Sequence, residues 1–109
     1  MVLSGIEYIN MTGERILIRK DGKWFPIESK GIAGIKKFAS PFLAKILTKN
    51  TVSPDGSVIE GLPKSKSEKL IIVPFEVKSR MVGVRDDLVT IPFDASHRDD
   101  GIYCTRLSW

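Results

Sequence analysis

The tripeptide Arg-Asp-Asp occurs twice, at residues 85–87 and 98–100, and gathers four carboxylates and two guanidinium groups into a short stretch. Paired carboxylates can perform acid–base catalysis or bind a divalent metal. A catalytic pair needs one carboxyl that stays protonated, whereas the arginine before each pair here favours the ionised state of both. We therefore predict that the repeat is not the acid–base centre of an enzyme.

Nucleophilic and metal chemistry are also disfavoured by the residue types. His97 and Cys104 are the only histidine and the only cysteine, which excludes an internal disulfide and leaves no zinc-ligand cluster. We expect His97 to lie in a loop and Cys104 to pack as a small core residue. The chain is therefore expected to be no enzyme, to bind no metal and to carry no cofactor.

A structural role for the repeat is one interpretation. Arg85 could pair with Asp99, and Arg98 with Asp86, because a guanidinium and a carboxylate form well-oriented bidentate hydrogen bonds. Asp87 and Asp100 would then accept hydrogen bonds from turn N–H groups. In this interpretation the two copies form a clasp between loops.

Ligand binding is the other interpretation of the repeat. Arginine recognises phosphates and carboxylates, an adjacent aspartate can accept from ribose hydroxyls, and aromatic rings can stack on a base. The flat rings are Trp24, Phe25, Tyr103 and Trp109; for Trp24 and Tyr103, packing in the core is the alternative. The side chains predicted to bind a nucleotide-type ligand are Arg85, Asp86, Arg98, Asp99, Asn10, Thr12, Trp24 and Tyr103. In a chain this short, we expect such a pocket at the interface of a homo-oligomer.

The sequence predicts that the elements that position these residues form a single β-rich domain spanning residues 1–109. Alternating apolar residues predict strands over 6–10 and 15–20, and Asp21-Gly22 predicts a tight hairpin turn after the second. Pro26 indicates that the strand after this turn is an edge strand or ends early. Residues 30–38 could form a further strand, and residues 40–50 fit either a helix or a buried strand.

The second half of the chain begins with a turn-rich segment over residues 51–69. An apolar run predicts a buried strand at 70–73, and Pro74 a short helix with Phe75, Val77 and Met81 facing inward. Residues 87–93 and 101–109 are expected to be the last two strands, joined by a polar loop. The predicted fold class is mainly β (α+β): a small antiparallel β-sandwich or partly open barrel with one or two short helices.

Composition agrees with a globular protein that has no membrane segment. The chain of 109 residues is 42% hydrophobic and 28% charged, and its longest apolar run, at 70–75, is too short to cross a bilayer. The N-terminus lacks the pattern of a signal peptide, so we expect a cytosolic location.

Charge is unevenly distributed along the chain. Residues 1–54 contain nine Lys or Arg and four Asp or Glu, whereas residues 55–109 contain eight and nine. A basic half suggests an anionic partner, although lysines on strand edges also discourage aggregation. The modest net charge of +4 and the scattered lysines disfavour nucleic acid as that partner.

Six motifs follow one another along the chain: YINMTGERILI, PIESKGIAGI, VIEGLP, LIIVPFEVKSRM, RDDLVTIP and RDDGIYCTRLS. Their order and spacing resemble a family of small bacteriophage proteins with an N-terminal Asn-Leu-Thr-Pro-His motif, a Glu-Gly-Leu-Pro motif and C-terminal Arg-Asp-Asp and Arg-Asp-Glu-x-Gly motifs. The chain departs from that pattern at Gly13-Glu14, where the family has Pro-His, and at Pro74, where it has Ser. The resemblance implies a phage origin and a compact β-rich fold.

A function follows from joining this resemblance to the candidate ligand residues. A small phage protein that binds without turnover could sequester a nucleotide-type signal of host immunity in the host cytoplasm. The alternative is a protein-binding module, or a structural accessory of the phage, that contacts a host or virion protein without any small ligand.

Overall fold

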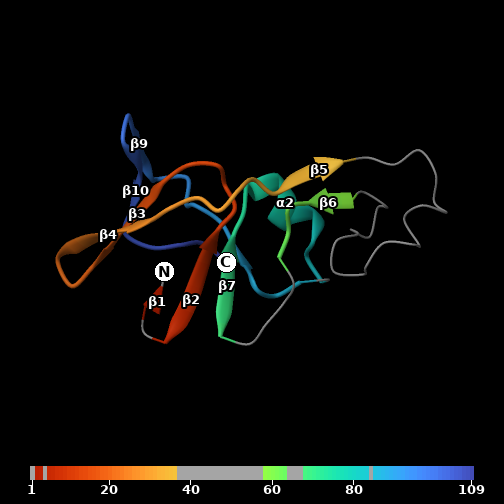
Figure 1. The fold of residues 1–109 in the computed structure, drawn as a ribbon, viewed down its shortest axis with the longest axis horizontal. Coiled ribbons are helices and arrows are strands. Elements are labelled where there is room, and N and C mark those ends of the chain that lie inside the picture. The colour runs from red at the N-terminus through yellow and green to blue at the C-terminus, as the bar shows by residue number, and fades with distance from the viewer. Residues whose placement is uncertain (1, 4, 37–57, 64–67, 84) are drawn as a thin grey trace.

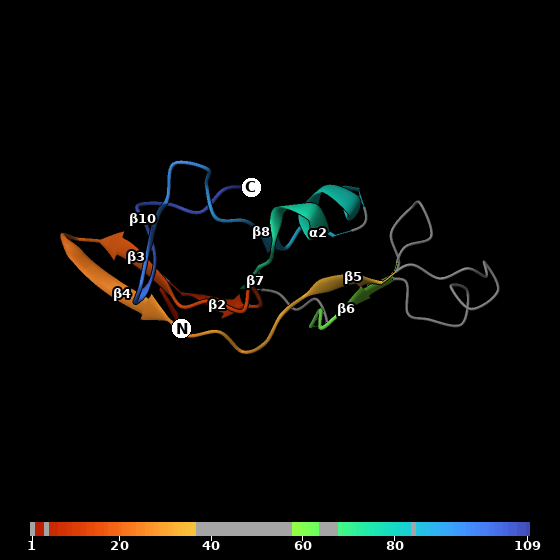
Figure 2. The same cartoon turned by 90° about the horizontal axis from the view of Figure 1, so that it is seen from above.

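Strands dominate the computed structural model, which describes residues 2–3, 5–36, 58–63, 68–83 and 85–109. The first sheet has the order β1-β2-β7-β8 and the second the order β4-β3-β10-β9, while β5 and β6 form a separate pair (Figures 1 and 2). Their bounds are β1 (Val2–Leu3), β2 (Ile6–Asn10), β3 (Ile16–Lys20), β4 (Lys23–Ile27), β5 (Gly34–Lys36), β6 (Val58–Glu60), β7 (Lys69–Ile72), β8 (Leu88–Val89), β9 (Ser96–Arg98) and β10 (Gly101–Cys104). The helix in the described residues is α2 (Phe75–Arg80).

The β-rich class with a short helix is as predicted, but the strand pairing is mixed. β2 pairs in parallel with β7, β7 with β8, and β3 with β10. A parallel pair needs a long crossover connection, which local turn patterns do not reveal. The expected antiparallel pairing therefore holds for the other strand pairs but not for these three, and the open edges of both sheets mean that the fold is not a closed barrel.

The β3–β4 hairpin confirms the turn prediction. Asp21 and Gly22 both have positive φ angles, 54° and 76°, as a two-residue type I′ turn requires. Pro26 lies in β4, which is the edge strand of its sheet, also as predicted.

Some segments differ from the expectations. Residues 96–98, predicted as a polar loop that includes His97, form the edge strand β9 antiparallel to β10. Val58–Glu60, within the turn-rich segment, forms β6 against β5. The segment 87–93 contributes only the two-residue strand β8, and the helix-or-strand choice for 40–50 lies outside the described residues.

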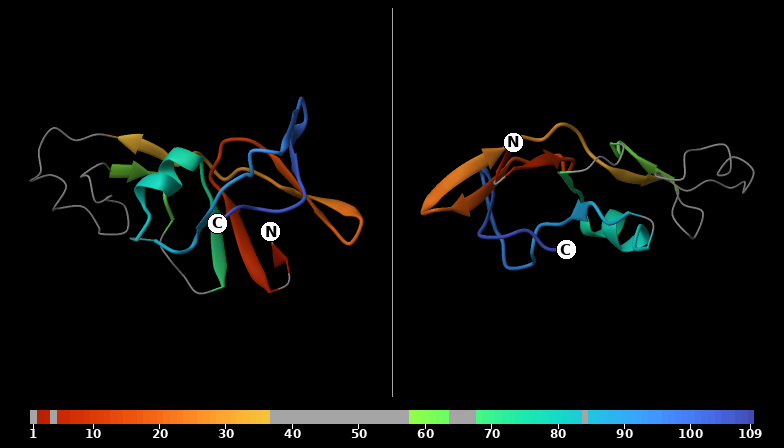
Figure 3. Two further views of the ribbon diagram at one scale, coloured as in Figure 1. Left: turned by 180° about the vertical axis from the view of Figure 1, so that it is seen from behind. Right: turned by 90° about the horizontal axis from the view of Figure 1, so that it is seen from below.

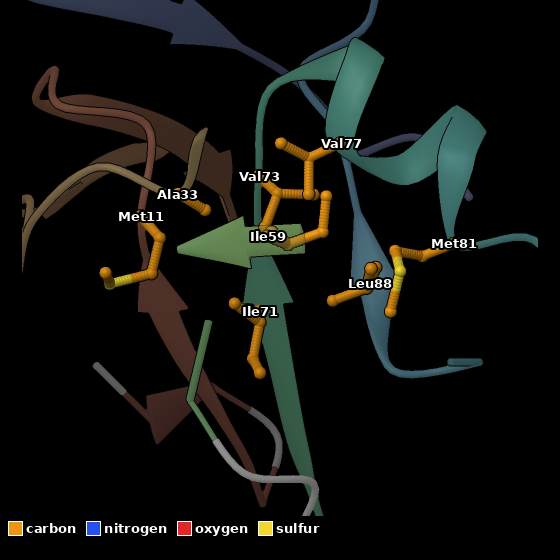
Figure 4. Close-up of a cluster of buried hydrophobic side chains, with 8 residues drawn as sticks. All are labelled: Met11, Ala33, Ile59, Ile71, Val73, Val77, Met81 and Leu88. Carbon is orange, nitrogen blue, oxygen red and sulfur yellow. The ribbon is translucent and has the colours of Figure 1, made fainter. Parts of the chain in front are cut away.

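Two clusters of buried side chains make up the core, and β7 contributes to both. Ile71 and the adjacent Val73 belong to the cluster beside α2, whereas Ile72 faces the cluster under the second sheet. Figure 4 shows Val77 of α2 directed toward Val73 in the first cluster, and Met81 beside Leu88. β7 is therefore buried on both faces, as its continuous apolar sequence predicts.

Helix α2 confirms the predicted short helix, but Phe75 does not face inward. Val77 and Met81 are fully buried and lie four residues apart, on one face of the helix. Phe75 precedes Val77 by two residues, about 200° around the helix, and its side chain is 56% exposed. Among the described residues, no helix is long and apolar enough to span a membrane.

Candidate functional site

The two Arg-Asp-Asp copies lie in different environments and do not form a clasp. Arg85 donates from Nε and Nη2 to the two carboxylate oxygens of Asp87, both at 2.8 Å, and from Nη2 to the Pro63 carbonyl at 2.9 Å. The Arg85 side chain is 2% exposed and that of Asp87 10%. Neither of the predicted pairs, Arg85–Asp99 and Arg98–Asp86, forms among the described residues, because Arg85 pairs within its own copy.

Asn10 and Thr12 support a turn. Asn10 is fully buried; its Nδ2 donates to the carbonyls of Glu14 and Ile27, at 2.6 and 2.9 Å. Its Oδ1 accepts from the N–H and the hydroxyl of Thr12, at 3.0 and 2.6 Å. The Asn10 amide is thus used by the protein, and its predicted ligand role is replaced by a structural one.

Trp24, Tyr103 and Arg98 do come together, on the outer face of the second sheet. The Trp24 and Tyr103 rings meet edge to face with centroids 5.0 Å apart, and the Arg98 guanidinium lies 4.7 Å from the Tyr103 ring centroid. A hydrogen bond from the Tyr103 hydroxyl to Asp100, at 2.6 Å, raises the pKa of Tyr103. These rings lie outside both core clusters, so the alternative of core packing for Trp24 and Tyr103 is wrong.

A cleft lies beside α2, away from the residues predicted to bind a ligand. Figures 2 and 3 show that α2 and the C-terminal segment lie on the same side of the strands β2 and β7. Between them is a cleft of about 630 Å³, which we call the aromatic cleft. Its lining residues are Phe75, Lys78, Ser79, Val82, Thr90, Ile91, Pro92, Phe93, Asp94, Arg106, Ser108 and Trp109.

Three exposed aromatic rings surround this cleft. The exposed fractions are 56% for Phe75, 92% for Phe93 and 70% for Trp109. The two phenyl rings contact one another with centroids 5.6 Å apart and planes tilted by 57°. Exposed apolar side chains that gather around one concavity indicate a binding surface rather than ordinary surface composition.

Two cations face the same cleft. The Lys78 ammonium donates to the Leu88 carbonyl at 2.9 Å and lies 5.7 Å from the Trp109 ring centroid. Partial burial lowers the pKa of Lys78 from its ordinary value of 10.5. Arg106 is exposed and 3.6 Å from Asp94, an arrangement that leaves its other donors to solvent or a ligand.

Backbone pairing fixes the C-terminal wall of the cleft. The Thr90 N–H donates to the Ser108 carbonyl and the Ser108 N–H donates to the Thr90 carbonyl, both at 2.7 Å. This bridge holds Trp109 next to the segment that carries Ile91 and Phe93. Sequence reasoning singled out the Trp109 ring but missed Phe75, Phe93, Lys78 and Arg106.

One sequence pattern could have pointed to Phe93. It stands between Pro92 and Asp94 in a turn closed by the Ala95 N–H to the Pro92 carbonyl, at 3.1 Å. A large apolar residue in a turn is exposed by geometry, so it indicates a contact outside the domain core.

The described part of the chain contains no cluster of three metal-binding side chains. Cys104 is buried in the core as predicted, and burial raises the pKa of its thiol. What the aromatic cleft can do chemically is to stack on a flat ring while Lys78 and Arg106 attract a negative charge. No family model, curated protein or solved structure matches the chain.

Proposed function

We propose that the protein binds a small nucleotide-type ligand in the aromatic cleft and sequesters it without turnover. The observation that carries this proposal is that one concavity joins three exposed aromatic rings to two cationic side chains. We place the ligand in this cleft rather than at the Arg-Asp-Asp residues predicted from the sequence.

Size and chemistry both support a small ligand. A volume of about 630 Å³ lies within the usual range of about 300–1,000 Å³ for ligand sites. Trp109, Phe75 and Phe93 offer ring faces for a base, and Lys78 and Arg106 offer donors for a phosphate. The hydroxyls of Thr90 and Ser108 line the same cleft and could orient a sugar.

Sequestration in the host cytoplasm is the biological role that fits these features together with the resemblance to small phage proteins. Such a protein needs affinity rather than catalytic groups. The homo-oligomer predicted from chain length remains a prediction.

A thermal-shift screen against linear and cyclic nucleotides, followed by calorimetry, tests the proposal. A ligand at a hundred times its dissociation constant stabilises the native state by about 2.7 kcal/mol, which is readily measured. Trp109→Ala and Lys78→Met should weaken binding, whereas the matched controls Trp24→Ala and Lys30→Met, outside the cleft, should not. Equal losses in all four variants, or no shift with any nucleotide, would contradict the proposal.

The same exposed rings favour a second candidate, a protein-binding module. Phe75, Val82, Phe93 and Trp109 present apolar surface that a partner protein could cover. In that case the nucleotide screen gives no shift, and a stoichiometric host or virion protein co-purifies with the wild-type chain but not with Phe93→Asp.

A further inference from the structure

A second hollow of different chemistry adjoins the aromatic cleft. This hollow, of about 260 Å³, shares Phe75, Ile91, Pro92 and Phe93 with the aromatic cleft. Its far side is formed by Thr12, Glu14, His97 and Ile102, and we call it the Glu14 hollow. The Phe75–Phe93 ring pair therefore lies in the wall that the two compartments have in common.

Two polar side chains of the Glu14 hollow, Glu14 and His97, are available to a ligand. The Glu14 side chain is exposed and forms no ion pair with a described residue, because the adjacent Arg15 binds Glu28 at 2.7 Å. The His97 side chain is also exposed and makes no hydrogen bond within the described part of the chain. A carboxylate that faces solvent beside an apolar wall can accept hydrogen bonds from ribose hydroxyls or from an amino group of a base.

Charge divides the two compartments. The aromatic cleft is lined by the cations Lys78 and Arg106 and by Asp94, which pairs with Arg106, whereas Glu14 is the carboxylate of the second hollow. The two cations outnumber the one carboxylate in the first compartment, so a phosphate is favoured there over the second. A ligand that fills both must therefore carry its charge at the cationic side and hydrogen-bond donors at the other end.

The Phe93 ring, in the wall that the two compartments share, is free to change its rotamer. The Phe93 side chain is 92% exposed, so it has few contacts to lose when its ring changes rotamer. Exposed side chains change rotamer on the picosecond to nanosecond scale, much faster than ligand binding requires. Rotation of this ring would change the shape of the shared wall, next to which the group that links two halves of one ligand would lie.

We infer that the ligand is of the dinucleotide class, with one nucleoside and the phosphate in the aromatic cleft and the second nucleoside in the Glu14 hollow. The inference rests on the function proposed above and narrows its ligand to two nucleosides joined through phosphate.

Calorimetry with the four mononucleotides and the matching linear and cyclic dinucleotides tests this inference. A dinucleotide should bind at least about tenfold more tightly than its mononucleotide, since one hydrogen bond to a charged group contributes about this factor. Glu14→Ala should remove most of that advantage while leaving mononucleotide affinity within about twofold. Glu76→Ala, an exposed carboxylate on α2 outside both hollows, is the matched control. Lys78→Met should weaken both ligand classes.

The outcomes separate this inference from the proposal on which it rests. If a mononucleotide binds as tightly as its dinucleotide and Glu14→Ala changes neither, the two-compartment ligand is wrong while nucleotide binding in the cleft stands. If no nucleotide of either class binds, both are wrong.

Discussion

Asp86 and Asp87 are neighbours in sequence with different surroundings. Asp87 is buried against Arg85, whereas Asp86 is exposed. We expect Asp87→Ala to lower the free energy of unfolding by about 3 kcal/mol, because it removes the carboxylate that Arg85 binds with two hydrogen bonds. Asp86→Ala should change it by less than about 0.5 kcal/mol. Urea denaturation measures both, and equal effects would contradict the structural role of Asp87.

The different surroundings of the two copies also explain why the site could not be predicted from the repeated tripeptide. Identical letters at 85–87 and 98–100 occupy a packed loop before β8 and an exposed edge hairpin. The carboxylate with which an arginine pairs depends on backbone geometry and burial. A three-residue motif determines neither of them. The ring type was informative: Trp24, Tyr103 and Trp109 do lie at the surface, where they can stack.

Lys78 makes the proposed binding dependent on pH. Its ammonium attracts an anionic ligand, and partial burial lowers its pKa below the ordinary 10.5. As pH rises through that lowered pKa, the charge is lost, so nucleotide affinity should begin to fall below the pH at which an exposed lysine titrates. Calorimetry over a pH series measures this fall. Lys78→Arg, which stays protonated, should shift the loss to higher pH, and an unchanged profile would show that Lys78 does not face the ligand.

Among the strands and turns, two hairpin glycines allow two costs of a side chain to be compared. One is the strain of a positive φ angle, and the other is steric contact with a neighbouring strand. Gly22 has φ +76° and open space around a built Cβ, so Gly22→Ala should destabilise by roughly 1 kcal/mol. At Gly101, φ is +147° and a Cβ would lie 2.7 Å from the Arg15 carbonyl oxygen and 2.9 Å from Leu17 Cδ1. Gly101→Ala should therefore destabilise by roughly 2–3 kcal/mol, as β10 must move away from β3. Chemical denaturation compares the two; a larger loss at Gly22 would contradict the close approach.

Elements set by local sequence were predictable, and those set by distant pairing were not. The β3–β4 hairpin follows from Asp21-Gly22, and α2 from the apolar spacing after Pro74. The edge strand β9 consists of Ser96, His97 and Arg98, all exposed, and its polarity is that of a loop. Only its pairing with β10 makes it a strand, and such tertiary effects override local propensity.

At the scale of the whole molecule, a single strand joins the two halves of the core. β7 lies between β2 and β8 in its sheet and places alternate side chains in the two hydrophobic clusters. Neither cluster can lose β7 without exposing apolar surface of the other. This shared strand predicts that both halves unfold together.

The two tryptophans make that prediction measurable, because Trp24 reports on the second sheet and Trp109 on the aromatic cleft. In the single-tryptophan variants Trp109→Phe and Trp24→Phe, the fluorescence transitions in urea should coincide. Ile72→Ala, at a fully buried position of β7, should lower the free energy of unfolding by about 2–5 kcal/mol and move both transitions equally. An earlier transition at Trp109 would mean that the layer of α2 and the C-terminal segment unfolds by itself. The cleft would then have to be ordered by its ligand, at a cost to affinity.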